Sequence, residues 1–336
     1  MYQLSFVFQG KVFFDNECRE VLKNIKRVRT LYPLSEIILS TWSVDVEKEK
    51  YLTSQLKNFD VKVIFSEDPG ALIYRDEKYK WVSNINRMLI SSKKGIDATS
   101  RDYVVKLRTD SYFINHNLKS LFLNREVINK RYNREKACSL FTERVINCNL
   151  FARHSRSYRP FDFHPGDIML LGRREDVLQF FDAPILDESI FEVIFNGAIF
   201  SLMHFVPEQH LWVNYIKSKI PNFNYRGNKT RSKEITLLSE KYYINNFIPF
   251  SCDQLGFVWP KYIDKYRSKG EGSIYQFTDW LELNKLFYNN KIKKNEIYNK
   301  YYKSKVLIHK LVYFSFYLPL RWAKIRRIIM DLKSRE

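Results

Sequence analysis

The first 110 residues alternate short apolar runs with stretches that have helical spacing. These runs, each short enough for a buried strand, cover residues 4–8, 36–42, 61–65 and 103–107. Between the first two runs, apolar side chains recur at three- and four-residue steps from Cys18 to Leu31, which is the spacing of one helix face. Strands that alternate with such helices form βαβ units, so we predict an α/β fold with a mainly parallel sheet flanked by helices.

Polar residues follow several of these predicted strands directly. Gln9 ends the first run, Asp68 lies in the turn after the third, and Asp110 follows the run 103–107. Ligands of parallel α/β sheets bind beyond the carboxyl ends of the strands. We therefore expect Gln9, Asp68 and Asp110 to lie together around a site of phosphate size.

Arg87 and Asp110, near this predicted edge, are suited to binding anions and cations, respectively. Arg87 is close to the start of a predicted helix, where it could face phosphate together with helix N–H groups, or lie on a solvated face. Asp110 stands near Arg108 and could offer an oxygen to Mg²⁺ or Mn²⁺, or cap the following turn.

Two carboxylates are candidates for a general base that accepts a proton from a hydroxyl group. Asp167 follows Gly166 at the mouth of a strand predicted over residues 163–172. Glu208 lies in the first turn of a helix that begins near Pro207, where it would also complement the helix dipole. The sequence leaves both assignments open.

Composition limits the classes of partner. A formal net charge of +19 attracts polyanions: nucleic acid, anionic lipid or phosphate-bearing small molecules. The basic residues are spread along the chain without a nucleic-acid-binding motif, so no nucleic acid is expected, although a basic nucleic-acid-binding protein stays the main alternative. Four cysteines at unrelated spacings favour a reduced, cytoplasmic compartment. The chain contains no HExxH, GxSxG, GxxxxGK[ST] or GxGxxG motif.

The C-terminal part differs in composition from the rest of the chain. Residues 285–335 mix Lys and Arg with Tyr, Phe, Leu and Ile, a composition typical of a helix that lies on an anionic membrane surface or packs on the protein. The longest apolar stretch, Val306–Leu320, is interrupted by His309, Lys310 and Pro319, so no membrane span is predicted. We divide the chain into a catalytic domain, 1–250, and a basic helical segment, 251–336.

Several short motifs occur in an order that resembles the WavE family of lipopolysaccharide-synthesis proteins, over approximately the first 215 residues. They are Phe6–Gly10, Glu36–Trp42, Ser66–Gly70, Asn84–Arg87, Lys106–Asp110, Gly166-Asp167 before Leu171-Gly172, and Pro207–Gln209.

This resemblance implies a GT-A-like, Rossmann-like glycosyltransferase. The basic C-terminal segment predicts that it lies on the inner face of the cytoplasmic membrane. It would move a sugar from a nucleotide-sugar donor to a lipid-linked or oligosaccharide acceptor of lipopolysaccharide core, O-antigen or capsule; a non-catalytic scaffold of polysaccharide assembly is an alternative. The donor-binding residues would be Gln9, Gly10, Asp68, Asn86, Arg87 and Arg108.

The same resemblance implies a divalent cation, Mg²⁺ or Mn²⁺, at Asp110. The Arg-Thr-Asp element 108–110 looks like the counterpart of an Asp-x-Asp motif, with Arg108 in place of the first carboxylate. The cation would then be held by fewer protein ligands or dispensed with.

Overall fold

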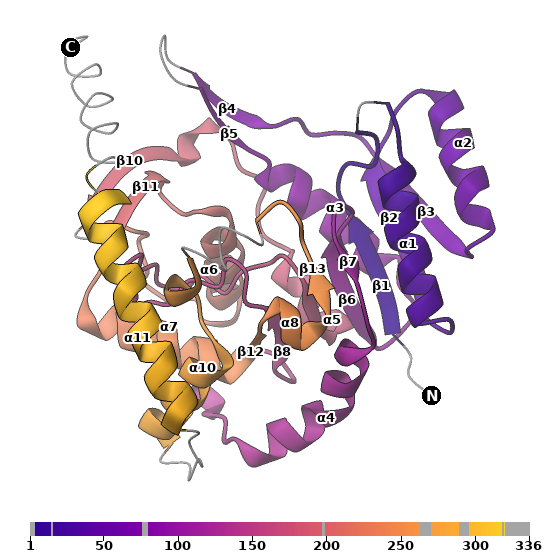
Figure 1. Cartoon of the computed structure of the whole chain (residues 1–336). Helices are drawn as coiled ribbons and strands as arrows, with labels where there is room; N and C mark the ends of the chain where they lie inside the picture. The colour runs from indigo at the N-terminus through magenta and orange to yellow at the C-terminus, as the bar shows by residue number, and fades with distance from the viewer. Residues whose placement is uncertain are drawn as a thin grey trace.

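The computed structural model describes residues 4–14, 16–75, 80–196, 199–262, 270–288, 296–317 and 319. At its centre is a seven-stranded sheet (Figure 1). From one edge to the other the strands are β3 (Val61–Ser66), β2 (Glu36–Trp42), β1 (Leu4–Gln9), β6 (Tyr103–Arg108), β9 (Leu170–Arg173), β8 (Val145–Cys148) and β12 (Phe247–Phe250).

Strand β9 is antiparallel to both of its neighbours, while the other pairs in this sheet are parallel. The carboxyl ends of β1, β2, β3, β6, β8 and β12 therefore share one sheet edge with the beginning of β9. We call this edge the rim. It is the place where a parallel α/β sheet binds ligands.

Helices cover both faces of the sheet. Side chains of consecutive strand residues point to opposite faces. Phe6 of β1 packs on Tyr32, directly after α1 (Arg19–Leu31). Its neighbour Val7 lies under Gly95 of α3 (Ile85–Asp97), on the other face, where α5 (Arg174–Phe180) also packs.

The remaining elements surround this core. They are α2 (Val46–Lys57), the pair β4 (Leu72–Arg75) and β5 (Lys80–Ser83), the pair β7 (Tyr112–Phe113) and β13 (Phe257–Val258), α4 (Asn117–Arg131), the pair β10 (Phe191–Asn196) and β11 (Ile199–Met203), α6 (Pro207–Lys219), α7 (Lys233–Asn246), α8 (Cys252–Leu255), α10 (Phe277–Tyr288) and α11 (Glu296–Val312).

The segment 251–336 contains the short strand β13 as well as the helices α8, α10 and α11 in its described ranges, and it contributes to the same core. Trp280 of α10 is fully buried, and its indole N–H donates to the carbonyl of Phe247 at 2.7 Å. The division at residue 250 stays a prediction. No helix in the described part of the chain combines the length and the hydropathy that crossing a bilayer requires.

The predicted α/β fold is confirmed, and the four apolar runs are strands β1, β2, β3 and β6. Two elements differ from their predictions. The spacing of Val82 to Ile85 and Leu89 predicts one helix that includes all three, but Val82 lies in β5 and the helix begins only at Ile85. The strand predicted over 163–172 is limited to Leu170–Arg173, because the chain before it runs along the rim as a loop.

Candidate functional site

Three of the predicted site residues are connected through α3. The guanidinium of Arg87 donates two hydrogen bonds to the Asp68 carboxylate, at 2.7 and 2.6 Å. One turn later, the hydroxyl of Ser91 lies 2.8 Å from Oε1 of Gln9 and 2.7 Å from the carbonyl of Arg87. Asp68 and Gln9 thus approach the same helix, from the ends of β3 and β1.

These side chains differ in accessibility. Gln9 is buried, whereas about a third of the Arg87 and Asp68 side chains is exposed. The hydrogen bonds from Arg87 are the main reason why the pKa of Asp68 lies below its ordinary value. The exposed edge of this pair is available to a ligand at the rim.

Asn86 has a different environment from Arg87. It is buried, and its amide exchanges two hydrogen bonds with the main chain of Leu186, at 2.7 and 3.0 Å. These bonds hold the segment before β10 against α3. The amide of Asn86 is therefore occupied by a structural contact.

Arg108 and Asp110 form a second ion pair, at the end of β6. Nε and Nη2 of Arg108 donate to the two carboxylate oxygens of Asp110, at 2.8 and 2.9 Å. The guanidinium carbon lies 4.8 Å from the ring centroid of Trp259. Burial favours protonated Asp110, but the opposing interactions, led by the Arg108 hydrogen bonds, keep its pKa below the ordinary value. Arg108 is thus held in a fixed orientation next to Gln9, its register partner on β1.

The turn after β1 is attached to the same place. Gly10 has φ +120°, a conformation that side-chain-bearing L-residues rarely adopt. The hydroxyl of Thr109 donates to the carbonyl of Lys11 at 2.6 Å, and the Thr109 N–H donates to the carbonyl of Gln9. Gly10 therefore lets the chain turn sharply where β1 and β6 end side by side.

A cleft of about 440 Å³ opens beside Asp110, on the face of the sheet that α1 covers. Asn24 of α1 lies in its wall and donates to the carbonyl of Thr109 at 3.0 Å. Of the three residues predicted to share one hollow, Asp110 lines this cleft and Gln9 and Asp68 do not. The lining residues are Phe14, Glu17, Arg19, Glu20, Val21, Asn24, Thr109, Asp110, Tyr112, Pro260 and Lys261.

The residues around Asp110 do not fit a metal centre built by the protein. Both carboxylate oxygens of Asp110 accept hydrogen bonds from Arg108. In the described ranges, no group of three or more His, Cys, Asp or Glu residues is arranged to hold a metal ion. The Asp110 carboxylate is thus engaged by Arg108 instead of being open to a cation.

A cluster of buried ionisable residues lies behind the rim. Lys106 of β6 is completely buried, and its ammonium donates to the main-chain carbonyl and the carboxylate of Asp167, at 2.5 and 3.2 Å. Nε2 of His164 is 3.5 Å from the carboxylate of Glu208, in the first turn of α6. The two predicted candidates for a general base thus belong to one cluster.

Burial changes the charges in this cluster. It raises the pKa of Glu208 to about 8, with a further contribution from the negative charge of Asp167. It also lowers the pKa of Lys106, despite Asp167, and holds the pKa of His164 well below its usual range. Glu208 therefore changes its charge near neutral pH, where proton transfer is most useful.

Gly166 explains how Asp167 reaches the rim. It has φ +78°, and a Cβ there would lie 2.9 Å from the main-chain nitrogen of Ala152 and 3.0 Å from the carbonyl oxygen of Leu150. Any side chain would push these two parts of the loop apart, so Asp167 depends on glycine before it.

Sequence reasoning did not assign a role to Lys106 or His164. Lys106 had a detectable signal, because a lysine inside an apolar strand needs a buried partner. His164 had none, since its partner Glu208 lies far away in sequence. Asn24 had no such signal either, because in the sequence it is one of several polar residues in the helix that follows β1.

Comparison with known proteins identifies the family. None of the curated protein sequences matches this chain significantly. The family model for WavE lipopolysaccharide synthesis matches residues 4–313. The chain belongs to the WavE family. The predicted resemblance is thus confirmed, and it extends beyond the first 215 residues into α11.

Solved structures similar to this WavE protein share little sequence with it. LgtC, in the form of an active-site mutant, is 13% identical, with 53% of this chain and 59% of LgtC covered and a TM-score of 0.33. Mouse xyloside xylosyltransferase 1 is 12% identical, with 75% and 85% covered and a TM-score of 0.34. S. aureus TarS is 12% identical, with 94% and 44% covered and a TM-score of 0.34.

Proposed function

We propose that this WavE protein is a glycosyltransferase that moves a sugar from a nucleotide-sugar donor to a surface glycan. The observation that carries the proposal is the oriented Arg108–Asp110 pair beside the cleft at the end of β6. Sugar transfer releases a nucleoside diphosphate, whose charge must be neutralised. A guanidinium is suited to this because its planar fork binds phosphate oxygens in pairs.

The cleft supports a nucleotide as the other part of the donor. Phe14, 41% exposed, and Tyr112 provide aromatic surface in its wall, and aromatic faces bind nucleobases by stacking. Asn24 adds a polar group whose Oδ1 is buried and makes no hydrogen bond among the described residues. Arg87 offers a second guanidinium on the rim. Gln9 and Gly10 form the turn at the end of β1.

We assign the general base to Glu208 and a positioning role to Asp167. The carboxylate of Asp167 is bound by Lys106. Glu208 has a pKa of about 8, so it is a much stronger base than a carboxylate with an ordinary pKa. In an inverting transfer, Glu208 takes the proton from the acceptor hydroxyl as its oxygen bonds to the anomeric carbon. The bond from that carbon to the diphosphate breaks, and the diphosphate leaves with the electron pair beside Arg108.

The proposed activity is tested with purified protein and a panel of UDP-, GDP- and CMP-sugars. Binding is measured by calorimetry, and hydrolysis or transfer by release of the nucleotide, with Mn²⁺ and with EDTA. At least one donor should bind and be consumed. If no donor binds or reacts in either condition, the assignment fails.

We further propose that the protein works on the inner face of the cytoplasmic membrane, with a lipid-linked or oligosaccharide acceptor. The outer side of α11 supports this location, because Leu307, Ile308 and Leu311 are each more than half exposed. The opposite side faces the body, where Lys305 pairs with Glu271. Exposed apolar residues together with lysines are typical of a helix lying on an anionic bilayer.

A further inference from the structure

A second hollow, of about 380 Å³, lies at the beginning of α7. Each titratable side chain in its lining is a cation, and two hydroxyl groups accompany them. The residues that line it are Arg156, Arg231, Ser232, Lys233, Thr236 and Leu237. The lining thus offers donors and positive charge, and no carboxylate.

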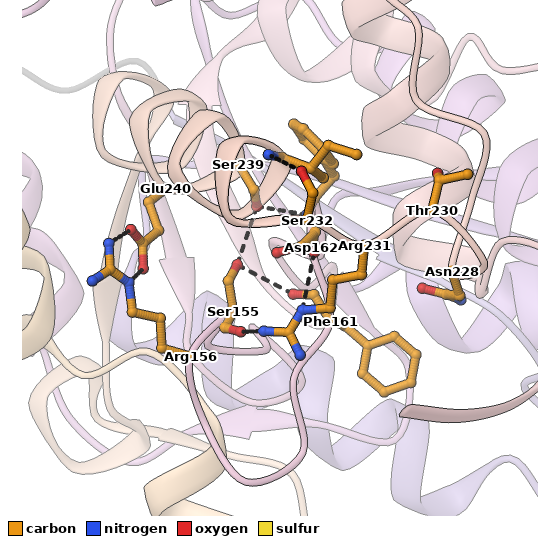
Figure 2. Close-up of polar contacts among 12 residues, drawn as sticks. Ser155, Arg156, Phe161, Asp162, Asn228, Thr230, Arg231, Ser232, Ser239 and Glu240 are labelled. Carbon is orange, nitrogen blue, oxygen red and sulfur yellow. Dashed lines mark hydrogen bonds and ion pairs between the residues drawn. The ribbon is translucent and has the colours of Figure 1, made fainter. Parts of the chain in front are cut away.

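Each arginine is paired with a carboxylate whose side chain is buried. Figure 2 shows Arg156 beside Glu240 and Arg231 near Asp162. Nε and Nη2 of Arg156 donate to the two oxygens of Glu240, at 2.7 and 2.5 Å, and the Glu240 side chain is completely buried. Nε of Arg231 is 3.5 Å from Asp162, whose side chain is 1% exposed. Neither carboxylate lines the hollow. Glu240 therefore orients the guanidinium of Arg156, and Asp162 attracts that of Arg231, without occupying the space in front of them.

Each guanidinium retains a group for a ligand. Nη2 of Arg231 donates to the carbonyl of Ser155, but within the described residues Nη1 of Arg231 and Nη1 of Arg156 make no hydrogen bond. Lys233 is exposed and opens the 14-residue helix α7, whose amino end adds positive potential. Glu234, the acid in that first turn, is outside the lining.

We propose that this hollow binds a phosphate or carboxylate group carried by the acceptor saccharide. This inference rests on the proposed glycosyl transfer and names the chemical class of its acceptor. Preoriented guanidinium groups favour phosphate and carboxylate over neutral hydroxyl groups, because the hydrogen bonds are charge-assisted.

The position of the hollow favours the acceptor over the donor. Arg156 belongs to the loop that leads from β8 to Asp167. In the sheet β8 lies on one side of β6, whereas β1, whose following residues line the Asp110 cleft, lies on the other. Arg156 also borders a larger hollow, of about 620 Å³, that continues towards α10 and α11. A saccharide chain could occupy that space while its anionic group binds between Arg156, Arg231 and Lys233.

The test measures binding of glucose 6-phosphate, glucose and inorganic phosphate to the full-length protein by ligand-observed NMR. Glucose 6-phosphate should bind more tightly than glucose and than inorganic phosphate. Lys233→Glu should weaken its binding at least tenfold, and Arg231→Gln should do so too. Lys57→Glu, an equal charge change on an exposed position of α2, should leave it within twofold. Thermal unfolding confirms that each variant is folded.

Three outcomes would overturn the proposal. They are unchanged binding in Lys233→Glu, equal affinity for inorganic phosphate and glucose 6-phosphate, and a Lys233-dependent interaction with phosphatidylglycerol vesicles alone. Nucleotide-sugar binding is measured on the same variants and should be unchanged, since a loss would assign the hollow to the donor. If the wild type binds no donor, the proposed glycosyl transfer fails while the anion measurements stay interpretable.

Discussion

Lys106 and Asp167 form an ion pair, 3.2 Å long, in which the lysine side chain has no exposed surface. The same ammonium donates to the main-chain carbonyl of Asp167 at 2.5 Å. One side chain from the middle of β6 therefore holds both the carboxylate and the main chain of Asp167, in the loop before β9. This contact connects the sheet to Asp167, the proposed positioning residue.

Replacing Lys106 by methionine should strongly destabilise the fold. Methionine fills similar space but leaves the Asp167 carboxylate and carbonyl without their buried donor, which costs about 3–5 kcal/mol. Chemical denaturation measures the change. Lys93→Met is the matched control, because the Lys93–Asp182 pair is about half exposed and should contribute less than about 1 kcal/mol. Equal effects of the two changes would contradict the structural role of Lys106.

Glu208→Gln should reduce the turnover of the enzyme about 10²–10⁴-fold, as expected for loss of a general base. Donor binding should stay within twofold. In the wild type, kcat should rise with pH up to about 8, where Glu208 becomes ionised, and this limb should vanish from the residual activity of the variant. A pH–rate profile with donor and acceptor saturating checks both points. Glu234→Gln, at an exposed position on α7, serves as the control.

The same residue should make the stability of the fold depend on pH. Glu208 has a pKa of about 8 in the folded protein and near 4.5 in the unfolded chain. Below pH 4.5 this difference in pKa makes its full contribution to the free energy of unfolding. The contribution is lost as the pH rises to 8. Glu208→Gln should therefore lose less stability between pH 5 and 8 than the wild type, by on the order of 1–3 kcal/mol. Parallel denaturation curves at several pH values measure this difference, and identical slopes would refute the assignment.

Arg108→Lys should weaken donor binding about tenfold or more, because a lysine ammonium cannot reproduce the two-point contact of a guanidinium with phosphate. EDTA should change the affinity of the wild type less than twofold, since Asp110 is engaged by Arg108. Calorimetry with the donor selected from the panel measures both effects. A strict requirement for Mn²⁺ would show that Asp110 leaves Arg108 to bind a cation.

Changing Leu307 and Leu311 to serine should reduce binding of the protein to vesicles that contain phosphatidylglycerol. Both side chains lie on the exposed face of α11, so the fold should be unaffected. Co-sedimentation at low and high salt measures binding. Val127→Ser on α4, 61% exposed in the wild type, is the control. If the double variant sediments like the wild type, α11 does not contact the membrane.

The parallel half of the sheet was predictable because its strands are buried on both faces. Strands β1, β2, β3 and β6 therefore appear as continuous apolar runs. Helix α2 was not predicted, since it buries only Leu52 and Leu56 and its sequence has little apolar periodicity. Residues 115–160 have an irregular pattern rich in Arg, Asn and Tyr, which indicates a long connection or a partly helical insertion; α4 lies in this stretch and buries only Leu118 and Phe122.

The part of the candidate site at the rim was predictable, and the buried cluster behind the rim was not. Asp110 and Arg108 directly follow an apolar run, so their place at the strand end could be derived from order along the chain. The proximity of Glu208 to His164 depends on how α6 packs, which no local pattern encodes. Nor does the sequence show that Asn86 binds Leu186, a contact across 100 positions.

The reversed direction of β9 has a consequence for how such enzymes could diversify. Since β8 ends and β9 begins at the rim, the connection 149–169 leaves and re-enters the sheet on the same side. It carries Arg156, Asp162, His164 and Asp167, and its apolar residues Leu150, Ala152, Phe163, Ile168 and Met169 pack into the core. On the proposed assignment, an exchange of this segment between homologues would alter acceptor choice, because it replaces Arg156 while every residue that lines the Asp110 cleft stays the same.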